Sequence, residues 1–216
     1  MSRFGQIVES LAARPRFSDM ARSAVEGGFR EHHALLRRMF PSPPASVLDL
    51  GCGSGIHAPV FASERYLGVD IQPEFIRHAL EKTPGHRFAV MDARRLGLAD
   101  GSFEAVLLSG VIHHLPDADA QIVLAETARV LRPDGRLLMW EDIPARQSWN
   151  LIGRAVHRLD VGGIIRRPEE YARLLEGSFE IVQAEEFRSG FMDYAAFLAR
   201  PRSSELPPSP PVCFHP

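Results

Sequence analysis

The stretch VLDLGCGSGIH, residues 47–57, joins a short apolar run to three glycines at every second position, Gly51, Gly53 and Gly55. A short apolar run bounded by glycine is typical of a buried strand. In a parallel sheet, ligands bind beyond the carboxyl ends of the strands, and glycines at the first strand-to-helix turn let an adenosine-bearing cofactor approach the main chain. The stretch therefore predicts a cofactor-binding turn after the first strand of an α/β sheet.

The spacing of these glycines separates two kinds of cofactor. The dinucleotide fingerprint G-x-G-x-x-G needs its third glycine at the position of Ile56, whereas here it lies one residue earlier, at Gly55. Asp49, two residues before the first glycine, suits the cationic amino group of S-adenosylmethionine but repels a pyrophosphate. Both features favour S-adenosylmethionine. Asp70, at the end of the next predicted strand, suits two ribose hydroxyls, and both cofactor classes use such an acid.

Short strand-like runs alternate with amphipathic segments along the middle of the chain. The runs are residues 46–50, 65–70, 87–92, 104–109 and 136–141, and the segments are residues 56–63, 73–82 and 117–131. Because the runs are apolar, this alternation predicts the α/β class, with a Rossmann-like, mostly parallel sheet and helices on both faces.

Two further features lie near the C-terminal end. Residues 166–177 predict a helix, with Pro168 in its first turn and Gly177 as its C-terminal cap. Residues 179–187 and 194–200 are strand-like, and Ser189-Gly190 is a turn signal between them, so we expect them to pair antiparallel.

The two ends of the chain differ from this pattern. Residues 3–13 and 18–40 have helical periodicity, and PSPP at 41–44 ends the second helix. The end of the chain is rich in proline, which predicts disorder. We expect an N-terminal helical cap (1–44), a cofactor-binding domain (45–200) and a disordered tail (201–216).

Composition and charge argue against several classes of protein. The chain has 216 residues, 45% hydrophobic and 24% charged, which suits one well-packed domain. Its net charge of −2 gives no basic field for nucleic acid, and no window approaches the roughly 18 apolar residues of a membrane span. We therefore expect a cytoplasmic protein. The only cysteines, Cys52 and Cys213, argue against a disulfide framework, and Cys52 is interpreted as a small apolar filler.

Five motifs follow one another in the order typical of one family. They are VLDLGCGSG, YLGVD, MDARRL, SFEAVLLSGVIHHLPD and RVLRPDGRLLMWE. Together, over roughly residues 45–200, they resemble class I S-adenosylmethionine-dependent methyltransferases, in the small-molecule group that includes ubiquinone and menaquinone biosynthesis methyltransferases. The resemblance implies a seven-stranded sheet in which only the last strand is antiparallel. It also implies S-adenosylmethionine as methyl donor and S-adenosylhomocysteine as product.

The resemblance assigns a role to each residue of the expected cofactor site. The assignments are Asp49, Gly51 and Gly53 at the methionyl end, Cys52 and Gly55 elsewhere in the cofactor-binding turn, Asp70 for the ribose, Ile71, Asp92 and Ala93 for the adenine, and Ser109 and Gly110 near the sulfonium. Other interpretations stay open. Asp49 can cap a helix, Asp70 can be an ordinary strand-end acid, and Asp92 can pair with Arg94 or Arg95.

Methyl transfer is a direct displacement at carbon, so alignment of donor and acceptor matters more than a protein nucleophile. A base is needed only if the acceptor loses a proton, and His113 and His114 are the nearest candidates. They can equally open the next helix, and Glu141 and Asp142 are alternative bases. His32 and His33 form a second pair, but no carboxylate spacing around either pair supports a ligand set, so we expect no metal.

The acceptor is the least determined part of the interpretation. The sequence SGVIHH replaces the Asn- or Asp-Pro-Pro-aromatic stretch of amino-directed DNA methyltransferases, so we expect a small-molecule acceptor and no nucleic acid. Residues 1–40 and 143–167 are expected to shape its pocket, with the arginines Arg154, Arg158, Arg166 and Arg167 either attracting an acidic group or forming a solvated face. A non-catalytic S-adenosylmethionine- or S-adenosylhomocysteine-binding protein and an NAD-dependent oxidoreductase remain alternatives.

Overall fold

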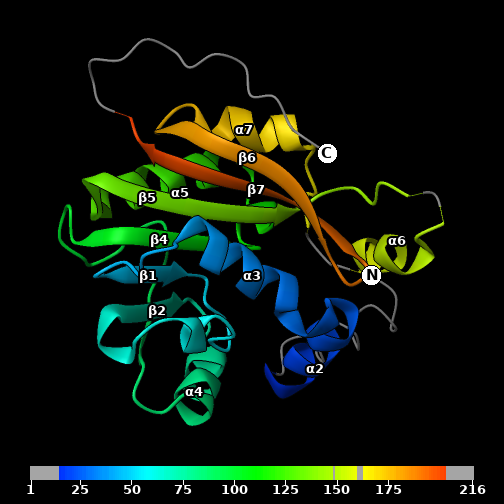
Figure 1. The fold of residues 1–216 in the computed structure, drawn as a ribbon, viewed down its shortest axis with the longest axis horizontal. Coiled ribbons are helices and arrows are strands. Elements are labelled where there is room, and N and C mark those ends of the chain that lie inside the picture. Colours follow the sequence, from blue (N-terminus) through cyan, green and yellow to red (C-terminus); the bar gives the residue numbers. More distant parts are fainter. Residues whose placement is uncertain (1–14, 148, 160–162, 203–216) are drawn as a thin grey trace.

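A computed structural model describes residues 15–147, 149–159 and 163–202 of the chain. In these ranges seven strands form one sheet in the order β3-β2-β1-β4-β5-β7-β6 (Figure 1). The strands are β1 (Val47–Leu50), β2 (Tyr66–Asp70), β3 (Arg87–Val90), β4 (Phe103–Ser109), β5 (Leu131–Asp142), β6 (Phe179–Ser189) and β7 (Met192–Pro201).

The direction of the strands confirms the predicted fold class. β1 pairs in parallel with β2 and β4, β2 with β3, and β4 with β5. β7 alone runs in the opposite direction, because it pairs antiparallel with both β5 and β6. The turn between β6 and β7 lies at the expected position, with Gly190 at φ 57°. The carboxyl ends of β1, β2, β4 and β5 therefore share one edge of the sheet.

Two apolar cores cover the two faces of this sheet. Alternate residues of β4 point to opposite faces, so Ala105 and Leu107 pack in one core while Val106 and Leu108 pack in the other. The first core lies under α3 (Arg30–Met39), and the second under α5 (Asp117–Val130) and α7 (Pro168–Leu175). Figure 1 shows α3 crossing one face of the sheet, and helices therefore cover both faces, as predicted.

The expected helix over residues 18–40 is two helices. α2 (Pro15–Val25) and α3 are separated by a 3₁₀ turn, η1 (Gly27–Phe29). Gly27 and Gly28 there have φ values of 64° and 71°, and the chain changes direction because glycine adopts this left-handed conformation without steric cost.

The expected helix over residues 56–63 is absent. Only two 3₁₀ turns form in that segment and just after it, η2 (Ala58–Val60) and η3 (Ser63–Arg65). Pro59 lies inside the segment, where it removes a helical hydrogen bond, and Phe61 is extended at φ −114° and ψ 152°. By contrast, the predicted helix 73–82 is formed as α4 (Pro73–Lys82), and 117–131 forms α5.

The segment after β5 contains α6 (Leu151–Leu159) and α7, with Pro168 in the first turn of α7 as predicted. Its C-cap is Glu176 rather than Gly177, and Gly177 has no positive φ. The predictions for residues 3–13, for Cys213 and for most of the tail lie outside the described residues. Among the residues that the structure describes, no helix is long and apolar enough to span a bilayer.

Candidate methyl-donor and acceptor site

All three glycines of the turn after β1 have left-handed backbone conformations. The φ values of Gly51, Gly53 and Gly55 are 68°, 51° and 69°. A Cβ atom at Gly51 would lie 2.3 Å from the Val111 side chain, and one at Gly55 would lie 2.8 Å from the ring of Phe88. Conformation and packing therefore both require glycine at these two positions.

Gly53 differs because its surroundings leave room. The nearest atom to a Cβ at this position belongs to Phe75, at 3.7 Å, which is an ordinary van der Waals contact. The amide of Gly53 donates to Asp70 Oδ2 at 2.9 Å. Gly53 is therefore the glycine of the turn at which an outside group can approach the backbone closely.

Asp70, the last residue of β2, connects this strand to the glycine turn after β1. Its Oδ1 accepts from the amide of Gln72 at 2.9 Å while Oδ2 accepts from Gly53. A carboxylate offers about four acceptor positions, so this half-buried group keeps capacity for hydroxyl donors. The next residue, Ile71, is 57% exposed, which leaves an apolar surface beside Asp70 on which a flat ring can lie.

Asp49 is fully buried and incompletely paired. Its Oδ2 accepts from the hydroxyl of Tyr66 at 2.6 Å, whereas its Oδ1 is buried without a hydrogen-bond partner. Burial raises the pKa of this carboxyl to about 7; the Tyr66 hydrogen bond opposes the rise and the charge of Asp70 adds to it. An unpaired buried carboxylate oxygen beside an open glycine turn fits a ligand that carries a cationic amino group.

Cys52 lies between two of these glycines and is also buried. Burial, with the charges of Asp49 and Asp70, raises the pKa of its thiol well above the usual value. A thiol kept protonated is a poor nucleophile, which agrees with its interpretation as an apolar filler.

Asp92 pairs with Arg94, which was the alternative interpretation of this acid from the sequence. Its two carboxylate oxygens accept from the guanidinium and from the amide of Arg94, at 2.8 to 3.2 Å. These hydrogen bonds lower the pKa of the Asp92 carboxyl. Ala93 is half-buried beside it. A contact of Asp92 and Ala93 with adenine stays a prediction.

The loop after β4 is built on one buried acid. Glu141, on β5, is completely buried and accepts from the amides of Val111, Ile112 and His113 at 2.8 to 3.3 Å. Its Oε2 also lies 2.6 Å from His113 Nδ1. This loop continues from Ser109 and Gly110, both half-buried, and Gly110 has a φ of 64°. Glu141 therefore fixes the backbone of the segment that was expected to face the sulfonium.

The two candidate histidines have different environments. His113 is buried, and its Nε2 points toward Asp142 Oδ2 at 3.8 Å. His114 is exposed, with its ring centroid 4.0 Å from that of His113. His113 is therefore held between two acids of β5, Glu141 and Asp142.

Arg166 also supports this loop and is unavailable to an acidic ligand. It is buried, its guanidinium donates to the carbonyls of Ile112 and Leu115 at 3.0 and 2.7 Å, and it pairs with Asp117 at 2.7 Å. Both alternatives for Arg166 are therefore wrong: its donors are used within the fold, so they are not available to an acidic group, and the side chain does not form a solvated face. The charge of Arg166 suggested an exposed role, but the side chain is buried and supports the loop instead.

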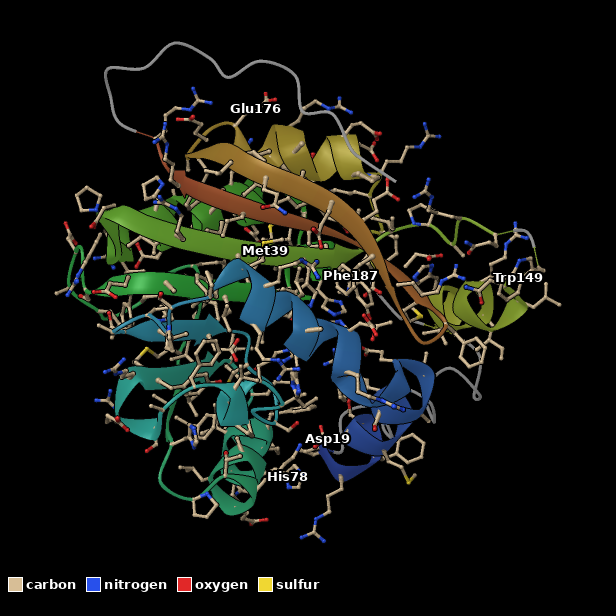
Figure 2. The ribbon with its side chains drawn as sticks, in the orientation of Figure 1. Asp19, Met39, His78, Trp149, Glu176 and Phe187 are labelled. Carbon is tan, nitrogen blue, oxygen red and sulfur yellow. The ribbon has the colours of Figure 1, made fainter. Side chains whose placement is uncertain are left out.

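The helix α2 covers the glycine turn from outside. Asp19 accepts from the hydroxyl of Ser54, inside the turn, and from Lys82 Nζ at 2.8 Å. Figure 2 shows Asp19 and His78 facing each other between α2 and α4, where they are 3.5 Å apart. An open pocket of about 510 Å³ lies between these helices and borders the turn at Ile56.

Some residues of this site were not found from the sequence. Tyr66 was assigned only to a strand, although it faces the same side of the sheet as Asp49 through β1–β2 pairing. Glu26 was not singled out either, although its side chain pairs with Arg22 at 2.8 Å and lies 3.5 Å from His32, both close to it in the sequence. Among the residues that the structure describes, no group of three or more His, Cys, Asp or Glu side chains is arranged to hold a metal ion.

Comparison with known proteins is consistent with this geometry. Residues 48–139 match a family model described as a methyltransferase domain. The chain is 30% identical over 209 residues to an uncharacterized 37.1 kDa protein of transposon TN4556 in Streptomyces fradiae, covering 89% of this chain and 60% of that protein. It is 34% identical over 113 residues to 2-methyl-6-phytyl-1,4-hydroquinone methyltransferase of Synechocystis sp., covering 49% of this chain and 35% of that protein. The chain thus spans less than two thirds of the length of these two relatives.

A solved structure shares the fold over nearly the whole chain. It is the N-methyltransferase NodS of Bradyrhizobium japonicum WM9 in complex with S-adenosyl-L-homocysteine. The TM-score is 0.70 at 18% identity, and the match covers 91% of this chain and 98% of that one.

Proposed function

We propose that the chain transfers a methyl group from S-adenosylmethionine to a small-molecule acceptor, because residues 48–139 match a methyltransferase-domain model and the chain shares its fold with a methyltransferase solved with S-adenosyl-L-homocysteine. The names of two relatives support the acceptor class: one is the hydroquinone methyltransferase from Synechocystis sp., and another is a ubiquinone biosynthesis O-methyltransferase from Xanthomonas oryzae.

The observation that carries the proposal is the unpaired Oδ1 of Asp49 beside the open backbone of Gly53. A buried carboxylate without a full set of partners costs stability unless a ligand supplies them. The amino group of a methionyl ligand is such a partner. Asp70 then holds the ribose, and the exposed Ile71 covers one face of the adenine.

When bound, S-adenosylmethionine supplies a methyl group on a positively charged sulfur. The residues of this chain align the acceptor: its lone pair forms the new bond to the methyl carbon as the carbon–sulfur bond breaks, and the electron pair of that bond leaves with the sulfur as S-adenosylhomocysteine. Positioning of this kind is worth roughly 7 to 11 kcal/mol. Ser109 and Gly110, held by the loop that Glu141 fixes, border the transfer.

His113 is the base for an acceptor that loses a proton. Its Nδ1 lies 2.6 Å from Glu141 Oε2, and its Nε2 lies 3.8 Å from Asp142 Oδ2. The two carboxylates are then the charge partners of the imidazolium that forms.

Calorimetric titration with S-adenosylmethionine and S-adenosylhomocysteine tests the proposal. We expect micromolar binding, weakened at least tenfold in Asp70→Ala, which is about 1.4 kcal/mol. Asp70→Asn, which keeps one acceptor oxygen for Gly53, separates loss of the ligand from loss of the turn. Asp134→Ala, an exposed acid at the opposite end of β5, is the control and should bind as the parent protein does.

Unchanged affinity in both Asp70 variants would remove Asp70 from the site. Tighter binding of NADH than of S-adenosylhomocysteine would favour an oxidoreductase. Binding without turnover of any acceptor would favour a non-catalytic binding protein.

A further inference from the structure

Four large apolar side chains are exposed at the end of the molecule that carries α6. They belong to Trp149, Leu151, Ile152 and Phe191, and their exposed fractions are 67%, 70%, 47% and 40%. Figure 1 shows α6 beyond the carboxyl end of β5, clear of the sheet, and Figure 2 labels Trp149 beside it at the margin of the molecule. We call these four residues the apolar tip.

Asn150 holds the parts of the apolar tip together. Its Oδ1 accepts from the amide of Gly153 at 2.9 Å and caps the first turn of α6. Its Nδ2 donates at 2.7 Å to the carbonyl of Phe191, in the turn between β6 and β7. A Cβ atom at Gly153 would lie 2.6 Å from that carbonyl oxygen, so α6 approaches the turn closely only because Gly153 has no side chain. The apolar tip is therefore a fixed part of the fold.

The exposed face of α6 is apolar although the helix already packs another face against the protein. Val156 is half-buried and packs against the core under α3, while Leu151, Ile152 and Ala155 are exposed. A surface helix normally turns polar residues to water. Monomeric soluble proteins rarely expose several large apolar side chains together, and such a patch marks an interaction site.

The ion pairs around the apolar tip expose their arginines and bury their acids. Arg146 is 50% exposed and pairs with Glu186, which is 15% exposed. Arg188 is 31% exposed and pairs with Asp193, which is 5% exposed. The Asp193 carboxylate also accepts from the amide of Arg146 at 3.1 Å, so the two pairs are neighbours. The charge that these pairs present to a partner is therefore positive.

Arginine also lies directly beside the apolar side chains. The guanidinium of Arg188 is 5.6 Å from the centre of the Trp149 ring, and Arg154, on α6 itself, is exposed. Tryptophan and leucine next to arginine are typical of helices that lie in the interface of a bilayer with anionic lipids. The amphipathic ring of tryptophan favours the level of the lipid headgroups.

These charges favour a lipid surface over a second copy of the chain. In a symmetric dimer the same patch lies on both partners, so the exposed arginines of one copy would face those of the other. Anionic lipid headgroups attract the same arginines. Because α6 lies at the margin of the molecule, its exposed side chains can enter a headgroup layer while the sheet stays outside it.

We propose that the apolar tip binds the surface of an anionic lipid bilayer. Its four side chains lie among the headgroups, and Arg154 and Arg188 lie against the lipid phosphates. Binding of this kind needs no spanning helix. The same helix α6 carries His157, which lies 4.0 Å from Asp142 at the carboxyl end of β5. The bound membrane is therefore at the same end of the sheet as the candidate site.

Co-sedimentation of the full chain with lipid vesicles tests this binding. The probes are vesicles of phosphatidylcholine alone and vesicles of phosphatidylcholine mixed with phosphatidylglycerol. We expect roughly tenfold or more stronger binding to the mixed vesicles, and a loss of this difference at high salt, which screens the attraction. Fluorescence is a second readout, because the chain has two tryptophans and Trp140 is 1% exposed. A blue shift and quenching by bromine-labelled lipid therefore report on Trp149.

A double variant tests the apolar contribution. Leu151→Ser/Ile152→Ser should weaken binding to the mixed vesicles about tenfold or more, because two large side chains no longer leave water. Leu80→Ser/Ile122→Ser is the matched control and should bind as the parent protein does, since both residues are 48% exposed and lie on α4 and α5. All four side chains are exposed, so the melting temperatures of both variants should stay close to that of the parent protein.

A charge reversal tests the arginines. Arg154→Glu should weaken binding to the mixed vesicles at least severalfold, because it replaces an attraction with a repulsion. Arg173→Glu, at an exposed position of α7, is the control and should leave this binding unchanged.

Four results would overturn the proposal. Absence of binding to both kinds of vesicle would exclude a membrane partner, and equal binding to both would exclude anionic lipid. Equal binding of Leu151→Ser/Ile152→Ser and the parent protein would exclude the apolar tip. A dimer that forms without lipid, shifts the fluorescence of Trp149 and is lost in the same double variant would assign the tip to contact between copies.

Discussion

Replacement of Glu141 by glutamine tests whether one buried acid organises the loop after β4. Glu141 is 0% exposed, and each of its oxygens receives two donors: Oε1 those of Val111 and Ile112, and Oε2 the amide and Nδ1 of His113. A glutamine keeps only one acceptor oxygen. Its NH₂ group then faces the two donors of His113.

The magnitude follows from these contacts. The amide of His113 loses its acceptor, and a buried donor left unpaired costs about 1 to 3 kcal/mol. The imidazole can change its tautomer, accepting at Nδ1, but it then carries its proton on Nε2. Loss of charge from the remaining hydrogen bonds adds to the cost, so we expect Glu141→Gln to lower the free energy of unfolding by about 3 kcal/mol. For a chain of this length the melting temperature should fall by roughly 6 to 12 °C.

The assays are thermal unfolding and ¹⁵N NMR of the His113 ring. Glu180→Gln is the matched control, because Glu180 pairs with Arg200 in a partly exposed ion pair at 2.8 Å and should contribute less than about 1 kcal/mol. The parent protein should show a proton on Nδ1, and Glu141→Gln should show it on Nε2 with a loss of turnover. Equal melting temperatures for the two variants would refute the assignment of Glu141 as the organising residue.

Three further predictions concern the turn and its supports. Because the pKa of the Asp49 carboxyl is raised from its usual value to about 7, the native state becomes less stable as the pH rises from about 4 to 7. The variant Asp49→Asn removes this loss, so chemical denaturation at pH 8 should show it to be more stable than the parent protein by up to about 4 kcal/mol. The same variant should bind S-adenosylhomocysteine more weakly. Gly55→Ala should destabilise the fold by about 2 kcal/mol or more, since its Cβ would lie 2.8 Å from the ring of Phe88. Gly53→Ala should lower the free energy of unfolding only by the roughly 1 to 2 kcal/mol of its left-handed backbone, while weakening cofactor binding at least tenfold. If the two variants had equal effects on unfolding and on calorimetric binding, Gly53 would not differ from Gly55 as a place for cofactor approach. Arg166→Lys removes the forked guanidinium donors that bind the carbonyls of Ile112 and Leu115. Amide hydrogen exchange of residues 111–117 should therefore become at least tenfold faster, while that of β2 stays unchanged. If exchange of residues 111–117 were the same in the variant and the parent protein, Arg166 would not stabilise this loop.

The strands were predictable because their apolar residues repeat locally. The runs at 46–50, 65–70 and 104–109 match β1, β2 and β4 within a residue or two, since a strand buried on both faces needs an unbroken apolar run. The antiparallel hairpin around Gly190 was predictable from its turn. The helix predicted over residues 56–63 is absent. Its amphipathic pattern suggested a helix, but Pro59 removes a helical hydrogen bond there, and only a 3₁₀ turn forms around it.

The residues that are expected to bind the methyl donor were more predictable from the sequence than those near the acceptor. Asp49, the glycines and Asp70 lie within one strand–turn–strand unit, so their relative positions follow from the topology. His32 meets Trp140 and Tyr194 only because α3 packs against β5 and β7, and no local pattern in the sequence predicts this packing. The sequence also left alternatives open for the arginines of residues 154–167 and for Asp92, because exposure and partners decide such roles and are known only after folding.

The most direct measurement is a crystal structure of the protein with S-adenosylhomocysteine. We expect the nucleoside to lie over Gly53, with its amino group toward Asp49, its ribose hydroxyls on Asp70 and its sulfur facing Gly110 and His113. A structure in which the ligand occupies another surface, or in which Asp49 and Asp70 make no contact with it, would show that the turn after β1 is not the methyl-donor site.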